Sequence, residues 1–437
     1  MNSFNRYLLG NAVVIAFLCT VSLAVADEPG QDNLYSGDFL KRSTLTGDWG
    51  GLRNDLARKG VTFDVSVTQT YQGVVDGGKD SSWEYGGRGD LTLKMDTGKM
   101  GLWPGGLLIV ELEGNWGKAV NRSTGALMTV NTNQAFPVVG EDLIALPALN
   151  YTQDLSKHVS LFAGKLDTIV TGDLNAFAHG KGEDQFMNLA FNINPVLIMT
   201  VPYSTLGAGV IIKPAKDPGA ALVSLAVVSS LGEANTSGFS DLSWNALTFT
   251  GEGRVRTDFF GRTGHQMVGF TYSNNEFTSL DQRLGAFLET GTILKNKGSW
   301  SVIYNFDQYL YEPQKGSGRG VGIFGRFGAS DGNPNPAKYF FSLGVGGKGV
   351  VASRPHDQFG IGWYYLDVGN PTFITPLGTL KLLHDEQGFE AYYNFAVTPW
   401  ALLTPDVQVV RPTQKATRYG QEVNTATVLG LRLQLVF

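Results

Sequence analysis

The 437-residue sequence predicts an all-β fold: a closed antiparallel transmembrane β-barrel of 16 strands, or alternatively 18, with a short N-terminal helix. Three observations support this prediction. The chain begins with an export signal, and most of it consists of short segments in which apolar and polar residues alternate. It ends in a leucine-rich alternating segment that terminates at Phe437.

The first 26 residues have the layout of a secretory signal peptide. Arg6 supplies a positive charge, residues 12–23 form an apolar run, and Ala24-Val25-Ala26 precede two acidic residues. We expect cleavage after Ala26 and export to the outer membrane of a Gram-negative bacterium. An uncleaved anchor is disfavoured because a spanning helix needs about 20 apolar residues. A lipid attached to Cys19 is disfavoured because bulky residues precede that position.

Composition excludes several classes of function. Cys19 is the only cysteine and leaves with the signal, so the mature chain has no disulfide, thiolate metal site or cysteine nucleophile. The formal net charge of −5 argues against nucleic acid as a partner, because phosphate binding needs a basic surface. The sequence shows no metal-ligand cluster or cofactor motif, and we expect neither a metal nor a cofactor.

Alternation with a period of two begins near residue 61 and continues to the end of the chain. In residues 61–71, for example, Val65 and Val67 share one face, whereas Asp64 and Thr68 share the other. The mature chain contains no apolar run of about 18 residues, so it predicts no spanning helix. A membrane barrel shows only alternating segments of about 10 residues, and the sequence fits this weaker pattern.

The last segment of the sequence distinguishes between two possible folds, a membrane barrel and a soluble sandwich. Leu429, Leu431, Leu433 and Leu435 share one face with Phe437, and Arg432 and Gln434 are on the other face. As the edge strand of a soluble sandwich, this apolar face would promote aggregation. In a closed barrel the strand has no free edge and its leucines face lipid, so we expect apolar residues outside and charged residues in the lumen.

Residues 27–60 are predicted to form a periplasmic segment ahead of a barrel domain at residues 61–437. Within it, residues 45–60 suggest a short amphipathic helix capped by Thr46 or Asp48, with Trp49, Leu52 and Leu56 among its apolar positions. Gly60 stands where the glycine that ends a helix belongs.

The sequence resembles a known family. The segment TGDWGGLRNDLARKGV, which starts at Thr46, resembles the N-terminal signature of OprB-type carbohydrate-selective porins. Further matches follow in order along nearly the whole mature chain, at residues 103–106 (WPGG), 162–167 (FAGKLD), 258–262 (DFFGR), 271–274 (TYSN), 330–336 (SDGNPNP), 390–394 (EAYYN) and 397–408. The resemblance implies a 16-stranded outer-membrane barrel that admits glucose and related sugars without energy input.

Strand parity selects charged residues that we expect to face the lumen and to form its constriction. Charged groups hydrogen-bond sugar hydroxyls and aromatic planes pack against sugar rings, so we expect a charged, aromatic-lined lumen with weak binding. The candidates for contact with sugar are Arg88, Asp90, Glu111, Glu113, Lys165, Asp167, Arg254, Arg326 and Glu390. The alternative for each is a structural role, as part of a solvated wall braced by ion pairs.

Three functions remain to be compared. The favoured function is passive diffusion of small, glucose-like sugars by a monomer or homotrimer that contacts outer-membrane lipid. A general, non-selective porin is the alternative. An outer-membrane hydrolase is disfavoured, because none of the five histidines lies in a catalytic motif. Residues 344–349 match GxGxxG, but no helix pattern follows, so we interpret them as a glycine-rich turn.

Overall fold

The computed structural model describes residues 35–137, 144–169, 175–217, 219–240, 242–369, 371–375, 378–381 and 383–437. The predicted signal peptide lies outside the described residues. No helix in the described part of the chain is long and apolar enough to cross a membrane.

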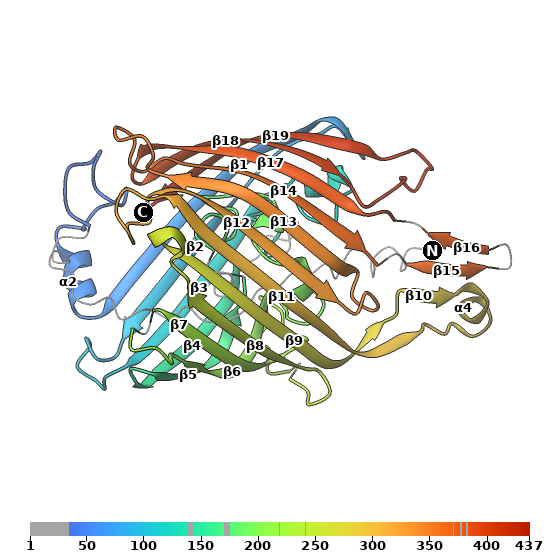
Figure 1. Ribbon diagram of the computed structural model, residues 1–437, viewed down its shortest axis with the longest axis horizontal. Coiled ribbons are helices and arrows are strands. Elements are labelled where there is room, and N and C mark those ends of the chain that lie inside the picture. The colour runs from blue at the N-terminus through green and yellow to red at the C-terminus, as the bar shows by residue number, and fades with distance from the viewer. Residues whose placement is uncertain are drawn as a thin grey trace.

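Sixteen antiparallel strands close into one barrel, as the sequence predicted (Figure 1). The barrel closes where the first strand pairs with the last, with Thr70 opposite Arg432. Its strands are β1 (Val61–Gly78), β2 (Trp83–Asp96), β3 (Gly106–Gly117), β4 (Ile144–Ser156), β5 (Val159–Asp167), β6 (Ser204–Ile212), β7 (Ala221–Ser229), β8 (Leu247–Arg256), β9 (Gly264–Thr278), β11 (Lys295–Tyr311), β12 (Gly320–Ser330), β13 (Ala337–Lys348), β14 (Gln358–Val368), β17 (Glu386–Thr398), β18 (Ala401–Arg411) and β19 (Asn424–Val436).

The two ends of the barrel differ in the length of their connections. At one end, two-residue turns join β4 to β5 and β17 to β18, whereas at the other end residues 168–203 separate β5 from β6. Short turns face the periplasm and long loops face outward in barrels of this kind. The outer loops carry α4 (Leu284–Thr290) and a small sheet of β10 (Asp281–Arg283), β15 (Thr372–Thr375) and β16 (Gly378–Lys381), which projects beyond the barrel (Figure 1).

The N-terminal helix forms, but its buried face is polar, contrary to the sequence analysis. α2 (Leu52–Arg58) begins after Gly51 rather than after a capping Thr46 or Asp48, and Gly60 has the expected positive φ of 84°. Arg53 and Asn54 are its buried residues, whereas Leu52 is exposed. Arg53 donates to the Phe63 carbonyl at 2.7 Å, so a charged side chain, not an apolar face, holds the helix against β1.

The strand faces agree with the parity predicted from sequence. On β19, Leu431 is 46% exposed on the outer face, whereas Arg432 is fully buried on the lumen side. The same holds on β11, where Trp300 and Val302 are exposed and Ser301 and Asn305 are buried. Apolar side chains therefore cover the outside of the barrel, and Arg88, Arg326 and Arg432 lie fully buried inside it.

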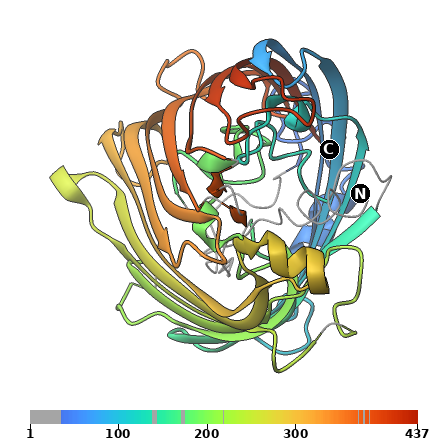
Figure 2. The same cartoon turned by 90° about the vertical axis from the view of Figure 1, so that its right-hand side faces the viewer.

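The interior is more densely filled than the sequence indicated, because two loops fold into the lumen (Figure 2). One loop follows β3 and carries α3 (Asn121–Thr124), and the other follows β5 and carries the 3-10 turns η2 (Leu189–Phe191) and η3 (Pro195–Leu197). Apolar residues of both loops form a cluster with inward-facing wall residues such as Phe324 and Phe340, and Val120 and Val130 of the first loop belong to a second, smaller cluster. The lumen thus contains an apolar core beside its charged surface.

Glycines on the inner wall make room for this core. A Cβ at Gly346 would lie 2.7 Å from Phe177, one at Gly360 would lie 2.6 Å from Phe186, and one at Gly362 would lie 2.5 Å from Phe191. The GxGxxG segment, residues 344–349, lies in strand β13 except for Gly349, which lies in the turn that follows. Its interpretation as a glycine-rich turn was therefore wrong.

Candidate functional site in the barrel lumen

Residues 175–203, which we call the inner loop, form the main inward projection. Two asparagine caps set its local shape: Asn188 accepts a hydrogen bond from the Ala190 amide at 3.0 Å, and Asn194 accepts one from the Val196 amide at 3.4 Å. These caps start the turns η2 and η3. The turns direct Phe191 and Val196 against the wall, where both are fully buried.

Charged wall residues hold the backbone of the inner loop. Arg432 on β19 donates to the carbonyls of Gly182 at 2.7 Å and Gln185 at 2.8 Å. On β17, Glu390 accepts hydrogen bonds from the amides of Met187 at 2.5 Å and Asn188 at 2.8 Å. These contacts satisfy buried backbone groups that have no secondary-structure partner, which fixes the loop in one position.

Amide and guanidinium groups add further attachments around the wall. Asn394 donates to the Asp184 carbonyl at 2.9 Å, and Arg326 on β12 donates to the carbonyl of Ala178. Asn194 donates in turn to the Phe327 carbonyl at 2.9 Å. The inner loop is therefore attached to β12, β17 and β19, on the far side of the barrel from the strand that precedes it.

Arg88 on β2 is the centre of a charged cluster beside the inner loop. Its guanidinium contacts Asp90 at 2.9 Å and pairs with Glu183 of the inner loop. It also donates to the carbonyls of Asn133 at 3.3 Å and Phe136 at 3.4 Å in the loop after β3. One arginine thus joins both inward-folded loops to the wall.

Lys181 links the inner loop to two other strands. Its ammonium group pairs with Glu113 on β3 and Asp167 at the end of β5, and all three side chains are at most 5% exposed. The hydroxyl of Tyr203 donates to the second oxygen of Glu113. The single buried ammonium group attracts both carboxylates and offsets part of their charge, so this triad fixes the loop electrostatically.

A cavity of about 300 Å³ lies against these charges, towards the end of the barrel where β1 begins. Its polar lining comprises Asp64, Ser66, Asp90, Thr92, Glu111, Glu113, Lys181, Glu183 and Gln434. Glu111 lines the cavity beside Asp167, with which its side chain shares a hydrogen bond. Carboxylates and an ammonium group on one cavity wall can accept from and donate to the hydroxyls of a small neutral molecule.

The structure brings five of the nine candidate residues together: Arg88, Asp90, Glu111, Glu113 and Asp167 lie around the cavity or in direct contact with its lining. The other four lie elsewhere. Arg326 and Glu390 hold the inner loop, as described above. Lys165 donates to the Ala234 carbonyl at 2.9 Å in the loop after β7, and Arg254 lies on β8, outside the lining of the cavity.

Sequence analysis missed Lys181 and Glu183, because they lie in a loop without strand alternation. A signal was present: a connection as long as residues 168–203 is unusual in a compact domain and often carries function. Among the described residues, no group of three or more His, Cys, Asp or Glu side chains could hold a metal ion.

Comparison with known proteins identifies the family. The family model described as carbohydrate-selective porin, OprB family, matches residues 80–437. The chain belongs to the OprB family. Membership in this porin family, together with the barrel, indicates a channel rather than an enzyme and a location in the bacterial outer membrane.

Porins of two Pseudomonas species are among the similar proteins. Porin B of Pseudomonas aeruginosa strain PAO1 is 27% identical over 166 residues, which span 34% of this chain and 35% of Porin B. The high-pH structure of Pseudomonas putida OprB is 20% identical, covers 92% of this chain and 100% of that chain, and has a TM-score of 0.76. Its low-pH structure is 18% identical, covers 91% and 99% of the two chains, and has a TM-score of 0.55. At these identities the structural likeness shows the fold of the OprB barrel.

Proposed function

We propose that this protein is an outer-membrane porin through which small, glucose-like sugars diffuse passively, without energy input. The observation that carries the proposal is the charged cavity beside the inner loop, in a member of a carbohydrate-selective family. The signal peptide would direct export and be removed after Ala26. Partners are small carbohydrates in the lumen and lipid around the barrel.

The arrangement of donors and acceptors supports a neutral, hydroxyl-rich substrate. Carboxylates of Asp64, Asp90 and Glu111 line the same cavity as the ammonium group of Lys181, so a sugar can donate and accept at the same site. Passage requires weak binding, and a millimolar dissociation constant, about 4 kcal/mol, is sufficient. Within the constriction we propose that Glu111 contacts the sugar directly and that Arg88 positions the two loops around it.

Single-channel recording in planar bilayers tests this function. We expect glucose to block the ion current in a saturable way, and swelling of proteoliposomes in glucose to exceed swelling in a disaccharide of equal osmolarity. A current that no sugar changes would leave a general, non-selective porin, which is the second candidate.

Glu111→Gln is expected to weaken the block of current by glucose about five-fold. A hydrogen bond to a charged acceptor is worth about 1 kcal/mol more than one to a neutral acceptor, and 1.4 kcal/mol is a factor of ten. The measurement is the glucose concentration that halves the current. Asp217→Asn removes the same charge in a periplasmic turn outside the cavity and is the matched control. An unchanged blocking concentration in Glu111→Gln would exclude direct contact between Glu111 and the sugar.

A further inference from the structure

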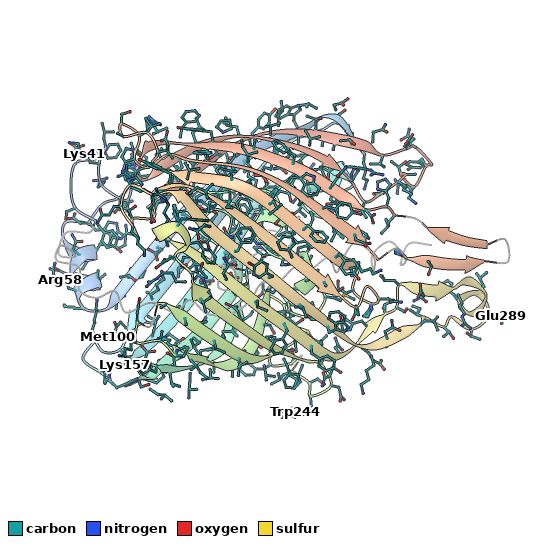
Figure 3. All side chains as sticks on the ribbon, viewed as in Figure 1. Lys41, Arg58, Met100, Lys157, Trp244 and Glu289 are labelled. Carbon is teal, nitrogen blue, oxygen red and sulfur yellow. The ribbon has the colours of Figure 1, made fainter. Side chains whose placement is uncertain are left out.

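Large apolar side chains are exposed on the segment ahead of the barrel, at its periplasmic end. Phe39 is 48% exposed, Leu40 62%, Trp49 43% and Leu52 56%. Lys41, which directly follows Leu40, and Arg58, which follows Leu52, lie at the same end as Met100 and Lys157 (Figure 3). Four such residues within 14 positions give this short segment a large share of exposed apolar surface, a feature of interaction surfaces.

This segment adjoins the outer face of the barrel at two places. The Trp49 ring lies 6.2 Å from the ring of Phe63, which has the same parity on β1 as the outward-facing Tyr71. The Phe39 ring lies 5.0 Å from that of Trp400, whose indole nitrogen donates to the Phe39 carbonyl at 2.8 Å. The segment is therefore attached to the rim at β1 and at the turn between β17 and β18, where lipid meets water.

The backbone is strained where it presents Trp49. This residue has a φ of 54°, in the left-handed region that non-glycine residues rarely adopt. A hydrogen bond from its indole nitrogen to Thr46 at 3.0 Å and the Arg53 guanidinium 5.1 Å from its ring hold it there. Strain of this kind is retained where a side chain has to be directed to a particular place.

The charge of the segment favours an anionic partner. Residues 35–60 contain five basic and three acidic residues, and without the buried Arg53 the segment presents four basic and three acidic side chains, although the whole chain is acidic. A net positive segment with exposed aromatic and leucine side chains fits the interfacial layer of a membrane with anionic headgroups. We propose that residues 35–60 anchor the barrel in the inner leaflet, with Leu40, Trp49 and Leu52 inserted among anionic phospholipids. The inference rests on the membrane location of the proposed function.

The test uses the absence of cysteine beyond Cys19. Leu40→Cys, Leu52→Cys, the lipid-facing Val302→Cys and the exposed turn variant Lys157→Cys each place one nitroxide label on the full mature chain in phosphatidylglycerol-containing nanodiscs. The readout is the accessibility of the label to oxygen relative to a water-soluble nickel chelate. We expect ratios at positions 40 and 52 several-fold above that at 157 and closer to that at 302, with a decrease when phosphatidylcholine replaces the anionic lipid.

Two outcomes overturn the proposal, and they differ from failure of the proposed function. In the first outcome, the labels at 40 and 52 are as accessible to nickel as the label at 157, while the label at 302 is in lipid. The barrel would then be embedded in the membrane, but the segment would lie in the water of the periplasm. In the second outcome, the label at 302 is in water. The barrel would then not be embedded in the membrane, and the porin function would be overturned as well.

Discussion

Lys181→Met is expected to raise the single-channel conductance and to make the current noisier. Lys181 lies between the buried carboxylates of Glu113 and Asp167. Removing one partner from a buried ion pair costs about 3–5 kcal/mol, because the remaining charge stays uncompensated in a poorly solvated place. The barrel ladder itself is intact in this variant, so the cost falls on docking of the inner loop. The loop would move away from the wall and widen the passage.

A compensated variant is the control for this prediction. Lys181→Met combined with Glu113→Gln and Asp167→Asn removes all three charges of the triad, so neither of its carboxylates is left without the ammonium group. We expect its conductance to return towards that of the parent protein. A folded Lys181→Met protein with the parent conductance would show that the triad does not hold the constriction in place.

The side chains of the barrel wall could be assigned to the lumen or the outer face from sequence, because this assignment depends only on alternation along each strand. Successive side chains point to opposite faces of a strand, so the parity of Arg88, Glu113 and Arg326 was sufficient to place them in the lumen. The contacts that these residues make could not be inferred from the sequence in the same way. Arg326 was expected to line the constriction, but it donates to the Ala178 carbonyl of a loop almost 150 positions away in the chain. Parity determines the side of the sheet, and only the folded chain determines the partner.

The inner loop could not be predicted, because its stability comes from pairing between distant segments. Phe186 and Phe191 are fully buried only because Gly360 and Gly362 on β14 leave space opposite them. In the sequence, these glycines resemble ordinary strand or turn residues. Glycines on the lumen parity of neighbouring strands, together with a long connection rich in phenylalanine, are the combined signal that would indicate an inserted loop.

On the outer face of the barrel, Leu431→Arg is expected to reduce the fraction of folded protein strongly. Leu431 is 46% exposed on the outer face, near the middle of β19, where its neighbours Leu429 and Tyr71 are also exposed. An arginine that faces lipid at the membrane midplane costs about 2–4 kcal/mol, a cost that falls to about 0–1 kcal/mol near the interfaces. The measurement is the fraction of protein that migrates as the compact, heat-modifiable form after refolding into vesicles.

Gln434→Arg on the same strand separates the effect of the outer face from that of a new charge. Gln434 is on the lumen side, lines the charged cavity and donates to Glu183 at 3.2 Å, so an arginine there meets water and carboxylates rather than lipid. We expect its folded fraction to match that of the parent protein. Equal folded fractions for the two arginine variants would mean that the outer face of β19 does not meet lipid. That result would contradict a barrel embedded in a membrane.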